Sequence, residues 1–196
     1  WNARAIHDKI GFTAITTQDI WRDHPEKVLG ATAEFVDKYP RTARAMVMAV
    51  LEASKFIDTM SNRAKVAGII ADKSYVNTEA GVIEGRMQGE YDNGIGKKWT
   101  DKNYMKFYND GQVTFPFVSD GMWFMTQHRR WGLLKEDIDY AAIAQKVNRV
   151  ALYKEAAAQV KVPLPKDPMR TATFFDGIKW DPKDSAQYAQ NFKLKA

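Results

Sequence analysis

The strongest apolar pattern in the sequence lies in residues 42–60, where apolar side chains recur at the three- and four-residue spacing of one helical face. That face is formed by Met46, Val47, Val50, Ala53 and Ile57. Thr42 is a residue type that caps helix N-termini. The pattern therefore predicts a helix that begins after Thr42 and ends near Met60.

Similar spacing predicts most of the later chain to be helical. Two helices are expected to follow directly, capped by Asn62 and Thr78. Their predicted inward faces are Val66, Ile69 and Ile70 in the first, and Val82 and Ile83 in the second. Further helices are predicted at residues 118–130, from Asp137 or Asp139 onward, at 151–160 and around 186–191.

The opening of the chain has a different pattern. Residues 11–17 are enriched in β-branched and aromatic side chains and predict a short strand, after which Thr17 caps a helix at 18–22. Residues 28–35 predict a second strand that leads into a helix, with a turn at 37–40. Strand followed by helix indicates an α/β fold class that is rich in helix.

Residues 89–111 predict an aromatic-studded loop or hairpin. Asn93-Gly94 is a turn signal, and it lies between Tyr91 and Trp99. A second turn is predicted at Phe174-Phe175-Asp176-Gly177, and the three prolines from Pro163 to Pro168 end the helix before it.

Composition narrows the classes of protein. The 196 residues are 45% apolar and 12% aromatic, which is enough to bury one core. The net charge of +5 comes from 29 basic and 24 acidic residues mixed along the chain, so no nucleic-acid partner is predicted. The absence of cysteine excludes disulfides, thiolate metal sites and a cysteine nucleophile. No apolar stretch approaches the roughly 20 residues of a membrane span.

The sequence carries no catalytic, cofactor or metal signature. His7, His24 and His128 lack the spacing that places two metal ligands on one helical face, so no metal site is predicted. Ser119 lacks a nucleophile elbow and is interpreted as a helix N-cap. The glycines near Gly89 match no nucleotide-binding fingerprint, and no cofactor is expected.

Two charged groups have competing interpretations. Asp137 and Asp139 are expected to act as caps and dipole partners rather than as acid and base. In Arg129-Arg130-Trp131, a guanidinium could hold an oxyanion beside an indole, but a surface pair that flanks a packed tryptophan is the favoured interpretation.

Several segments, in the same order, resemble the nitrate- and bicarbonate-binding proteins that serve ABC importers. The opening Trp1-Asn2 is similar to the end of a Pro-Trp-Asn motif, and Trp123-Phe124-Met125-Thr126 is similar to another family segment. The other similar segments are residues 10–14, 20–27, 35–40, 130–132, 146–149, 173–177 and 180–182. Residues 91–98 depart from the family pattern.

The resemblance implies part of a type II periplasmic-binding-protein-like fold. Residues 1–196 would form a single C-terminal region of a two-lobed protein: the C-terminal part of the first lobe and a C-terminal helical extension. Residues 1–40 would hold the crossover and sheet strands, and residues 41–196 the helix-rich remainder.

The resemblance also implies a function, which is capture of nitrate, nitrite or bicarbonate between the lobes and delivery to a permease. The implied partners are ABC permease and ATPase subunits, and the implied location is the periplasm or the outer face of the plasma membrane, with a lipid-anchored parent. Only Trp1 and Asn2 are carried over as pocket-adjacent, because most family ligand contacts would lie upstream. The natural N-terminus is expected to be missing, since the chain opens on Trp1 without a signal segment.

Three alternatives remain open at this point. The parent could be a cytoplasmic nitrate sensor, a regulatory binding domain fused to a transporter ATPase, or an enzyme of unknown type, of which the last is disfavoured. We also expect the isolated fragment to dimerise or repack, because a lobe cut at its crossover would leave apolar surface uncovered.

Overall fold

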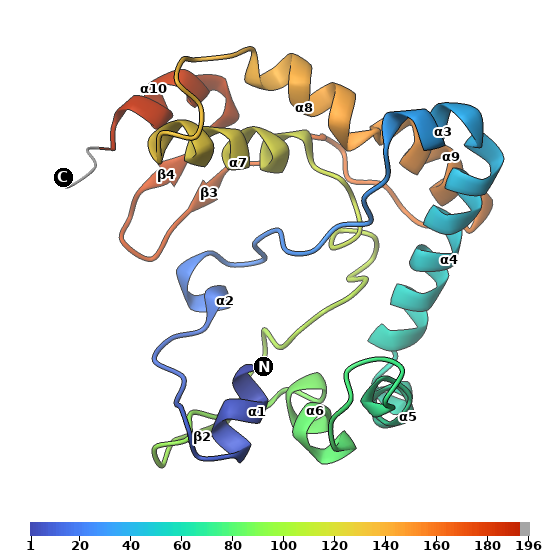
Figure 1. The fold of residues 1–196 in the computed structure, drawn as a ribbon, viewed down its shortest axis with the longest axis vertical. Coiled ribbons are helices and arrows are strands. Elements are labelled where there is room, and N and C mark those ends of the chain that lie inside the picture. Colours follow the sequence, from blue (N-terminus) through green and yellow to red (C-terminus); the bar gives the residue numbers. More distant parts are fainter. Residues whose placement is uncertain (193–196) are drawn as a thin grey trace.

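The computed structural model describes residues 1–192, which form an open arc of helices with two small antiparallel hairpins (Figure 1). The first half contains α1 (Asn2–His7), α2 (Thr17–Ile20), α3 (Ala33–Lys38), α4 (Pro40–Asp58), α5 (Met60–Ala71) and α6 (Ala80–Met87), followed by β1 (Glu90–Asp92) and β2 (Lys98–Thr100). The second half contains α7 (Val118–Arg130), α8 (Tyr140–Asn148), α9 (Val150–Gln159), β3 (Ala172–Thr173), β4 (Lys179–Trp180), the 3-10 turn η1 (Pro182–Asp184) and α10 (Ser185–Gln190).

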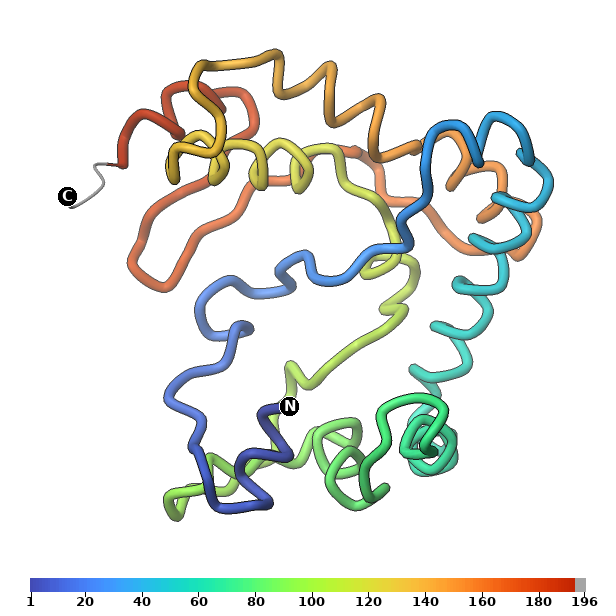
Figure 2. Tube along the Cα trace, in the orientation of Figure 1, coloured from blue at the N-terminus to red at the C-terminus, as the bar shows by residue number. Residues whose placement is uncertain are grey.

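Helix α4 connects the two ends of this arc. At one end lie α5, α6, α1 and the β1–β2 hairpin, and at the other lie α7, α8, α10 and the β3–β4 hairpin (Figure 1). Residues 8–32 run back from the first end toward the second, as the tube in Figure 2 shows. The N-terminal segment therefore touches both ends of the arc.

Three clusters of buried apolar side chains hold these parts together. The first lies where α4 meets α9, around Leu51, Phe115 and Tyr153. The second joins α7, α8, β4 and α10 around Trp180, and the third joins α5 to α6 around Ala67. Helices α7 and α8 approach closely because Gly121 has no side chain: a Cβ there would lie 2.7 Å from the Asn148 side-chain oxygen.

The helix at residues 42–60 is confirmed, but it starts earlier than predicted, and of its predicted apolar face only Val47 and Ile57 pack against buried clusters. It begins at Pro40, whose fixed φ suits the first helical position, and Tyr39 precedes it. The buried positions are Ala43, Leu51 and Ser54, whereas Met46 and Val50 are exposed. Two adjacent faces of α4 are apolar, and packing against α9 decides which of them is covered.

Four predicted N-caps are wrong by one to three residues. Thr17, Asn62, Thr78 and Ser119 were the predicted caps; the observed caps of α2, α5, α6 and α7 are Thr16, Thr59, Glu79 and Phe117. Only the first of these observed caps uses its side chain, in a capping box with Asp19. The other three observed caps make no side-chain capping hydrogen bond, and a search for capping side chains therefore misplaced these helix starts.

Asp139 is confirmed as the cap of α8, because its carboxylate accepts the N–H of Ala142 at 2.9 Å. The aromatic hairpin is also confirmed. Strands β1 and β2 pair in antiparallel register with Tyr91 opposite Trp99, and the two rings stack at 5.4 Å. The turn after Phe174 is confirmed by the β3–β4 hairpin, with Gly177 at a positive φ of 82°.

The strands predicted at residues 11–17 and 28–35 are not present. Residues 11–15 and 28–32 have no regular secondary structure, α2 begins at Thr17, and α3 occupies residues 33–38. A strand needs a neighbour to receive its backbone hydrogen bonds, and no strand of the described residues pairs with either segment. The turn predicted at 37–40 is reduced to Tyr39, between α3 and α4.

Candidate functional site

Trp1 and Asn2, which the family resemblance marked as pocket-adjacent, are the first two residues of the chain. Trp1 is 98% exposed and Asn2 begins α1. Helix α1 packs against α6, and Arg4 donates across this contact to Thr78 at 3.4 Å and, within its own turn, to Asp8 at 2.6 Å. The N-terminus lies on the inner side of the arc, near α1 and α6 (Figure 1).

The β1–β2 hairpin supports the segment that follows α1. The Thr13 N–H donates to the Asn93 carbonyl at 2.9 Å, and Arg86 donates to the Thr13 hydroxyl at 3.1 Å. Gly94 has a φ of +80°, and a Cβ there would lie 3.1 Å from the Gly11 carbonyl oxygen, so glycine is required for this approach. The loop at 91–98, which departs from the family pattern, is therefore a support for residues 6–13.

A groove of about 590 Å³ lies between these two segments. Lys9 and Lys98 line it from opposite sides, together with Asp92. The Gly94 N–H and then Lys98 hold the pKa of Asp92 below its ordinary value, so this carboxylate is ionised at neutral pH. The Lys98 ammonium nitrogen lies 3.3 Å from a carboxylate oxygen of Asp92, so the two charges offset each other.

A buried ion pair anchors the connection that follows the hairpin. Asp58 accepts the N–H groups of Phe107, Tyr108 and Asn109, each at 2.8 Å, and the Arg63 guanidinium at 2.6 Å. Arg63 is 1% exposed, and it also donates to the backbone carbonyls of Met87 and Met105. The carboxylate and the guanidinium together fix α5, α6 and the connection against one another.

A second buried pair ties the N-terminal segment to the far end of the arc. Arg170 binds Asp120 with two hydrogen bonds, at 2.9 and 2.6 Å, and donates to the Asp23 carbonyl at 3.1 Å. The Arg170 N–H donates to the Ser119 hydroxyl at 3.0 Å. Burial raises the pKa of Asp120, and the Arg170 guanidinium opposes that rise. Residues 21–24 are therefore held on α7.

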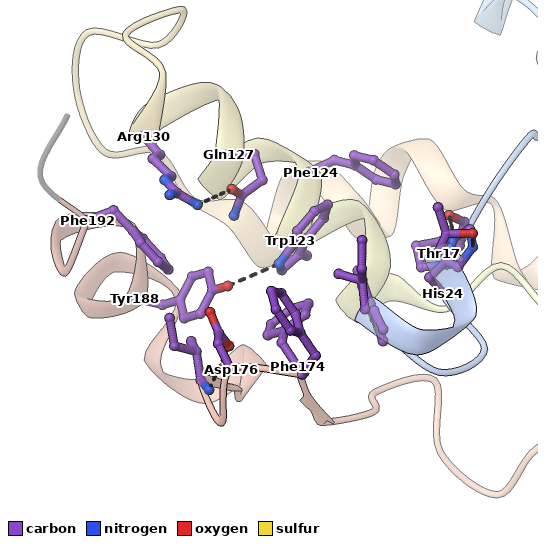
Figure 3. Close-up of a pocket in the computed structure, with 15 residues that line it drawn as sticks. Thr17, His24, Trp123, Phe124, Gln127, Arg130, Phe174, Asp176, Tyr188 and Phe192 are labelled. Carbon is purple, nitrogen blue, oxygen red and sulfur yellow. Dashed lines mark hydrogen bonds between the residues drawn. The ribbon is translucent and has the colours of Figure 1, made fainter. Parts of the chain in front are cut away.

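An aromatic pocket of about 380 Å³ lies where residues 17–25 meet α7, the β3–β4 hairpin and α10. Trp21 packs edge-on against Trp123 at 4.8 Å and against Phe174 at 5.2 Å. Figure 3 shows Trp123 and Phe174 in the centre of the wall, with Phe124 beyond them. The pocket is mostly apolar.

Polar groups occupy two ends of this pocket (Figure 3). At one end His24 lies 2.7 Å from the Thr17 hydroxyl and 2.9 Å from the Pro25 carbonyl, which satisfies both ring nitrogens. At the other end Arg130 donates to Gln127 at 3.4 Å and covers the Phe192 ring at 3.9 Å. Asp176 also lines this second end.

The remaining sequence candidates have structural roles. Ser119 is buried and accepts the Arg170 N–H, so its interpretation as a cap is wrong; it has no histidine partner among its described contacts. Asp137 accepts hydrogen bonds from Gln190 and Tyr140, which hold its pKa low, and it lies 3.5 Å from Arg129. The Arg129-Arg130 pair is thus divided: Arg129 meets a carboxylate and Arg130 faces the aromatic pocket.

His7 and His128 are exposed, and within residues 1–192 no three His, Asp or Glu side chains gather as metal ligands. No described helix is both long and apolar enough to cross a membrane.

Sequence reasoning missed the pocket-lining role of Trp21, His24 and Phe174. Residues 20–27 and 173–177 were noted only as family-like segments. Because the two segments lie far apart in the sequence, nothing in it indicates that both line the same pocket.

Comparison with known proteins places this arrangement in context. Residues 1–71 match the NMT1-like family. The whole chain is 35% identical to the nitrate/nitrite binding protein NrtA of Nostoc sp. PCC 7120 and 33% identical to the bicarbonate-binding protein CmpA of Synechococcus elongatus PCC 7942, covering 45% and 46% of those proteins. It is also 33% identical, over 99% of its length, to 29% of the nitrate import ATP-binding protein NrtC of Synechocystis sp. PCC 6803.

The structural similarity agrees with the sequence similarity. The crystal structure of the periplasmic nitrate-binding protein NrtA from Synechocystis PCC 6803 superposes with a TM-score of 0.93 at 34% identity. The superposition covers 99% of this chain and 52% of that protein. The chain therefore spans about half the length of the binding proteins that it matches, and it has the fold of the matched part of NrtA.

Proposed function

Over its whole length the chain is homologous to one part of the nitrate- and bicarbonate-binding proteins, and from this premise we propose that it belongs to the capture component of an ABC importer for a small oxyanion. The ligand would be nitrate, nitrite or bicarbonate, held between two lobes and passed to a permease. The observation that carries the proposal is the end-to-end match to NrtA in both sequence and structure.

Several further features of the proposal follow from the same match. Similar identity to nitrate and bicarbonate binders supports the anion class without choosing within it. The periplasmic location of NrtA supports a periplasmic or outer-face location for this protein, with lipid anchoring and permease and ATPase partners as parts of the proposal. Binding rather than catalysis is proposed, because the matched NrtA and CmpA proteins are binding proteins.

Within this function, we propose that Trp1 and Asn2 border the anion pocket. The exposed indole of Trp1 can exclude water from one side of a planar anion, and the Asn2 amide offers a neutral hydrogen bond. The β1–β2 hairpin and α6 would set the position of both residues through α1 and Thr13.

Anion binding is expected in the complete gene product that contains these residues. Isothermal titration calorimetry should show binding of nitrate, nitrite or bicarbonate and none of chloride. Asn2→Ala should weaken binding by about two- to tenfold, the range of one hydrogen bond. Trp1→Ala should also weaken it, because water would then reach the anion. Trp131→Ala, which removes an exposed tryptophan at the end of α7, is the matched control.

Unchanged anion affinity in both N-terminal variants would show that the pocket does not reach Trp1 and Asn2. Absence of binding to all three anions and to related small oxyanions would contradict the transport function itself.

The match to NrtC favours a second candidate, a regulatory anion-binding domain attached to an importer ATPase. The same calorimetry would detect the anion in either case. An ATP-binding domain in the complete gene product, with an ATPase rate that changes when nitrate is added, would select this candidate. A product without such a domain would exclude it.

We also propose that the isolated 196-residue chain self-associates through its N-terminal segment. Ile10 is 80% exposed and Val28 is 84% exposed, and Phe12 and Leu29 beside them are exposed as well. Light scattering should give a mass above that of one chain, and the double variant Ile10→Lys, Val28→Lys should return it toward a monomer.

The exposed Leu133, which follows α7, provides the control for this prediction. Leu133→Lys should leave the mass of the wild-type chain unchanged. A monodisperse wild-type monomer would overturn the proposal.

A further inference from the structure

The aromatic pocket is a site distinct from the surroundings of Trp1 and Asn2, since neither of these residues lines it. We propose that this pocket binds a small organic monocarboxylate, with an apolar ring or branched chain among the aromatic side chains and its carboxylate on Arg130. The inference does not depend on the oxyanion function.

The size and lining of the pocket suit an apolar ligand body. Its volume of about 380 Å³ falls within the usual range of small-molecule pockets, about 300–1,000 Å³. Trp123 and Phe174 stand in its wall, and the edge-on contacts of Trp21 with both rings fix their orientation. A ring placed against this wall would replace water on apolar surface, which is favourable.

Arg130 provides the charge. Within residues 1–192 no carboxylate lies within ion-pair distance of Arg130, whereas the neighbouring Arg129 meets Asp137 at 3.5 Å. The Arg130 guanidinium is held over the Phe192 ring and against Gln127 (Figure 3). A guanidinium held in this way is suited to bind a carboxylate through two parallel hydrogen bonds.

Tyr188 adds a donor at the same end. Its hydroxyl oxygen accepts the Trp123 indole N–H at 3.3 Å, which leaves the hydroxyl proton available to a ligand. Burial raises the pKa of Tyr188, and the phenol therefore stays protonated at neutral pH. Arg130 and Tyr188 therefore both offer donors where the ligand carboxylate would lie.

Asp176 limits the charge of the ligand. It lines the pocket beside Tyr188, and its carboxylate accepts the Ile178 N–H at 3.0 Å within the β3–β4 turn. A dianion would be repelled by this group. A monocarboxylate is compatible with it, and the ammonium group of an α-amino acid would be attracted to it. The shared chemistry is an apolar body with one carboxylate, and the test distinguishes these two sources.

The test is calorimetric titration of the full chain with phenylacetate, phenylalanine and the neutral analogue 2-phenylethanol. Phenylacetate should bind more tightly than 2-phenylethanol. Arg130→Gln should weaken phenylacetate binding by about tenfold or more, the effect of a charged hydrogen bond, and should leave 2-phenylethanol unchanged. Arg41→Gln, at an exposed arginine on α4, is the matched control and should change neither affinity.

The two sources are separated by Asp176→Asn. If the natural ligand class is an amino acid, phenylalanine should bind the wild type more tightly than phenylacetate and lose that advantage in this variant. If the natural ligand class is a simple carboxylate, phenylacetate should bind more tightly than phenylalanine, both in the wild type and in Asp176→Asn. Either result supports the site.

Three outcomes would overturn the proposal: absence of phenylacetate and phenylalanine binding, equal affinity for phenylacetate and 2-phenylethanol, or unchanged phenylacetate affinity in Arg130→Gln. Saturating nitrate should not displace phenylacetate, and displacement would show that the site is not separate. Circular dichroism of each variant confirms that the comparison is made on folded protein.

Discussion

Asp58→Ala is expected to lower the free energy of unfolding by about 3–5 kcal/mol, the usual cost of leaving a buried charge without its partner. The substitution removes the acceptor for three consecutive N–H groups, at Phe107 to Asn109, and leaves the buried Arg63 guanidinium without a carboxylate. Urea denaturation followed by circular dichroism measures the change.

Two variants calibrate that result. Glu52→Ala removes an exposed carboxylate from the same helix and should change stability by no more than about 0.5 kcal/mol. Asp58→Asn keeps a side-chain oxygen as acceptor, so its loss of unfolding free energy should lie between those of Asp58→Ala and Glu52→Ala. If Asp58→Ala unfolds at the same urea concentration as the wild type, Asp58 does not hold the connection after β2 in place.

The sequence predicted most of the helices, although it missed α1, and it was less reliable for the residues that cap them. The sequence placed α7 at its observed bounds and α4 within two residues of them, because a long amphipathic repeat is an average over many positions. A cap depends on one residue, and Thr42, Asn62 and Thr78 each offered capping chemistry, but the caps are Tyr39, Thr59 and Glu79, which make no side-chain capping hydrogen bond. Of the two predicted caps of α8, Asp137 and Asp139, the second is the one observed, because its carboxylate accepts the Ala142 N–H.

The errors near the N-terminus have another cause. The composition of residues 11–17 is that of a strand, but a strand is completed only by a partner. Within residues 1–192 the backbone of Thr13 makes one hydrogen bond, from its N–H to the Asn93 carbonyl, and its hydroxyl accepts another from Arg86. The composition of this segment therefore favours a strand, but no strand forms because no other strand of the described residues pairs with it.

The candidate sites show the same limit. Family resemblance named Trp1 and Asn2, and their role stays a prediction. For Arg129-Arg130 the sequence raised an oxyanion-binding role but favoured a surface pair beside a packed tryptophan, and Trp131 is in fact 60% exposed. The structure separates the two arginines: Asp137 meets Arg129, while Arg130 faces the aromatic pocket. That division depends on α10 and the β3–β4 hairpin, which lie more than forty residues later in the sequence.

Arg170→Met is the second substitution with a large expected effect, again about 3–5 kcal/mol of unfolding free energy, because it leaves Asp120 buried without its cation. It also releases the Asp23 carbonyl, and with it the residues that carry Trp21 and His24 into the pocket wall. Phenylacetate binding should therefore weaken together with stability. The matched control is Arg149→Met, which breaks an exposed pair with Asp37 and should cost at most about 1 kcal/mol.

The pH dependence of the Arg170→Met effect distinguishes a buried charge from lost packing. Burial raises the pKa of Asp120 above the ordinary 3.8, and removal of Arg170 should raise it further. A raised folded-state pKa adds stability below the unfolded value, and that stability is lost as pH rises through the folded value. The loss of stability in Arg170→Met should accordingly shrink in acid and be largest at neutral pH.

Asp120→Asn in the same background should recover part of the loss at neutral pH, because no buried charge remains. A deficit that is constant from neutral to acid pH and unaffected by Asp120→Asn would show that Arg170 acts through its packing on Phe117 instead.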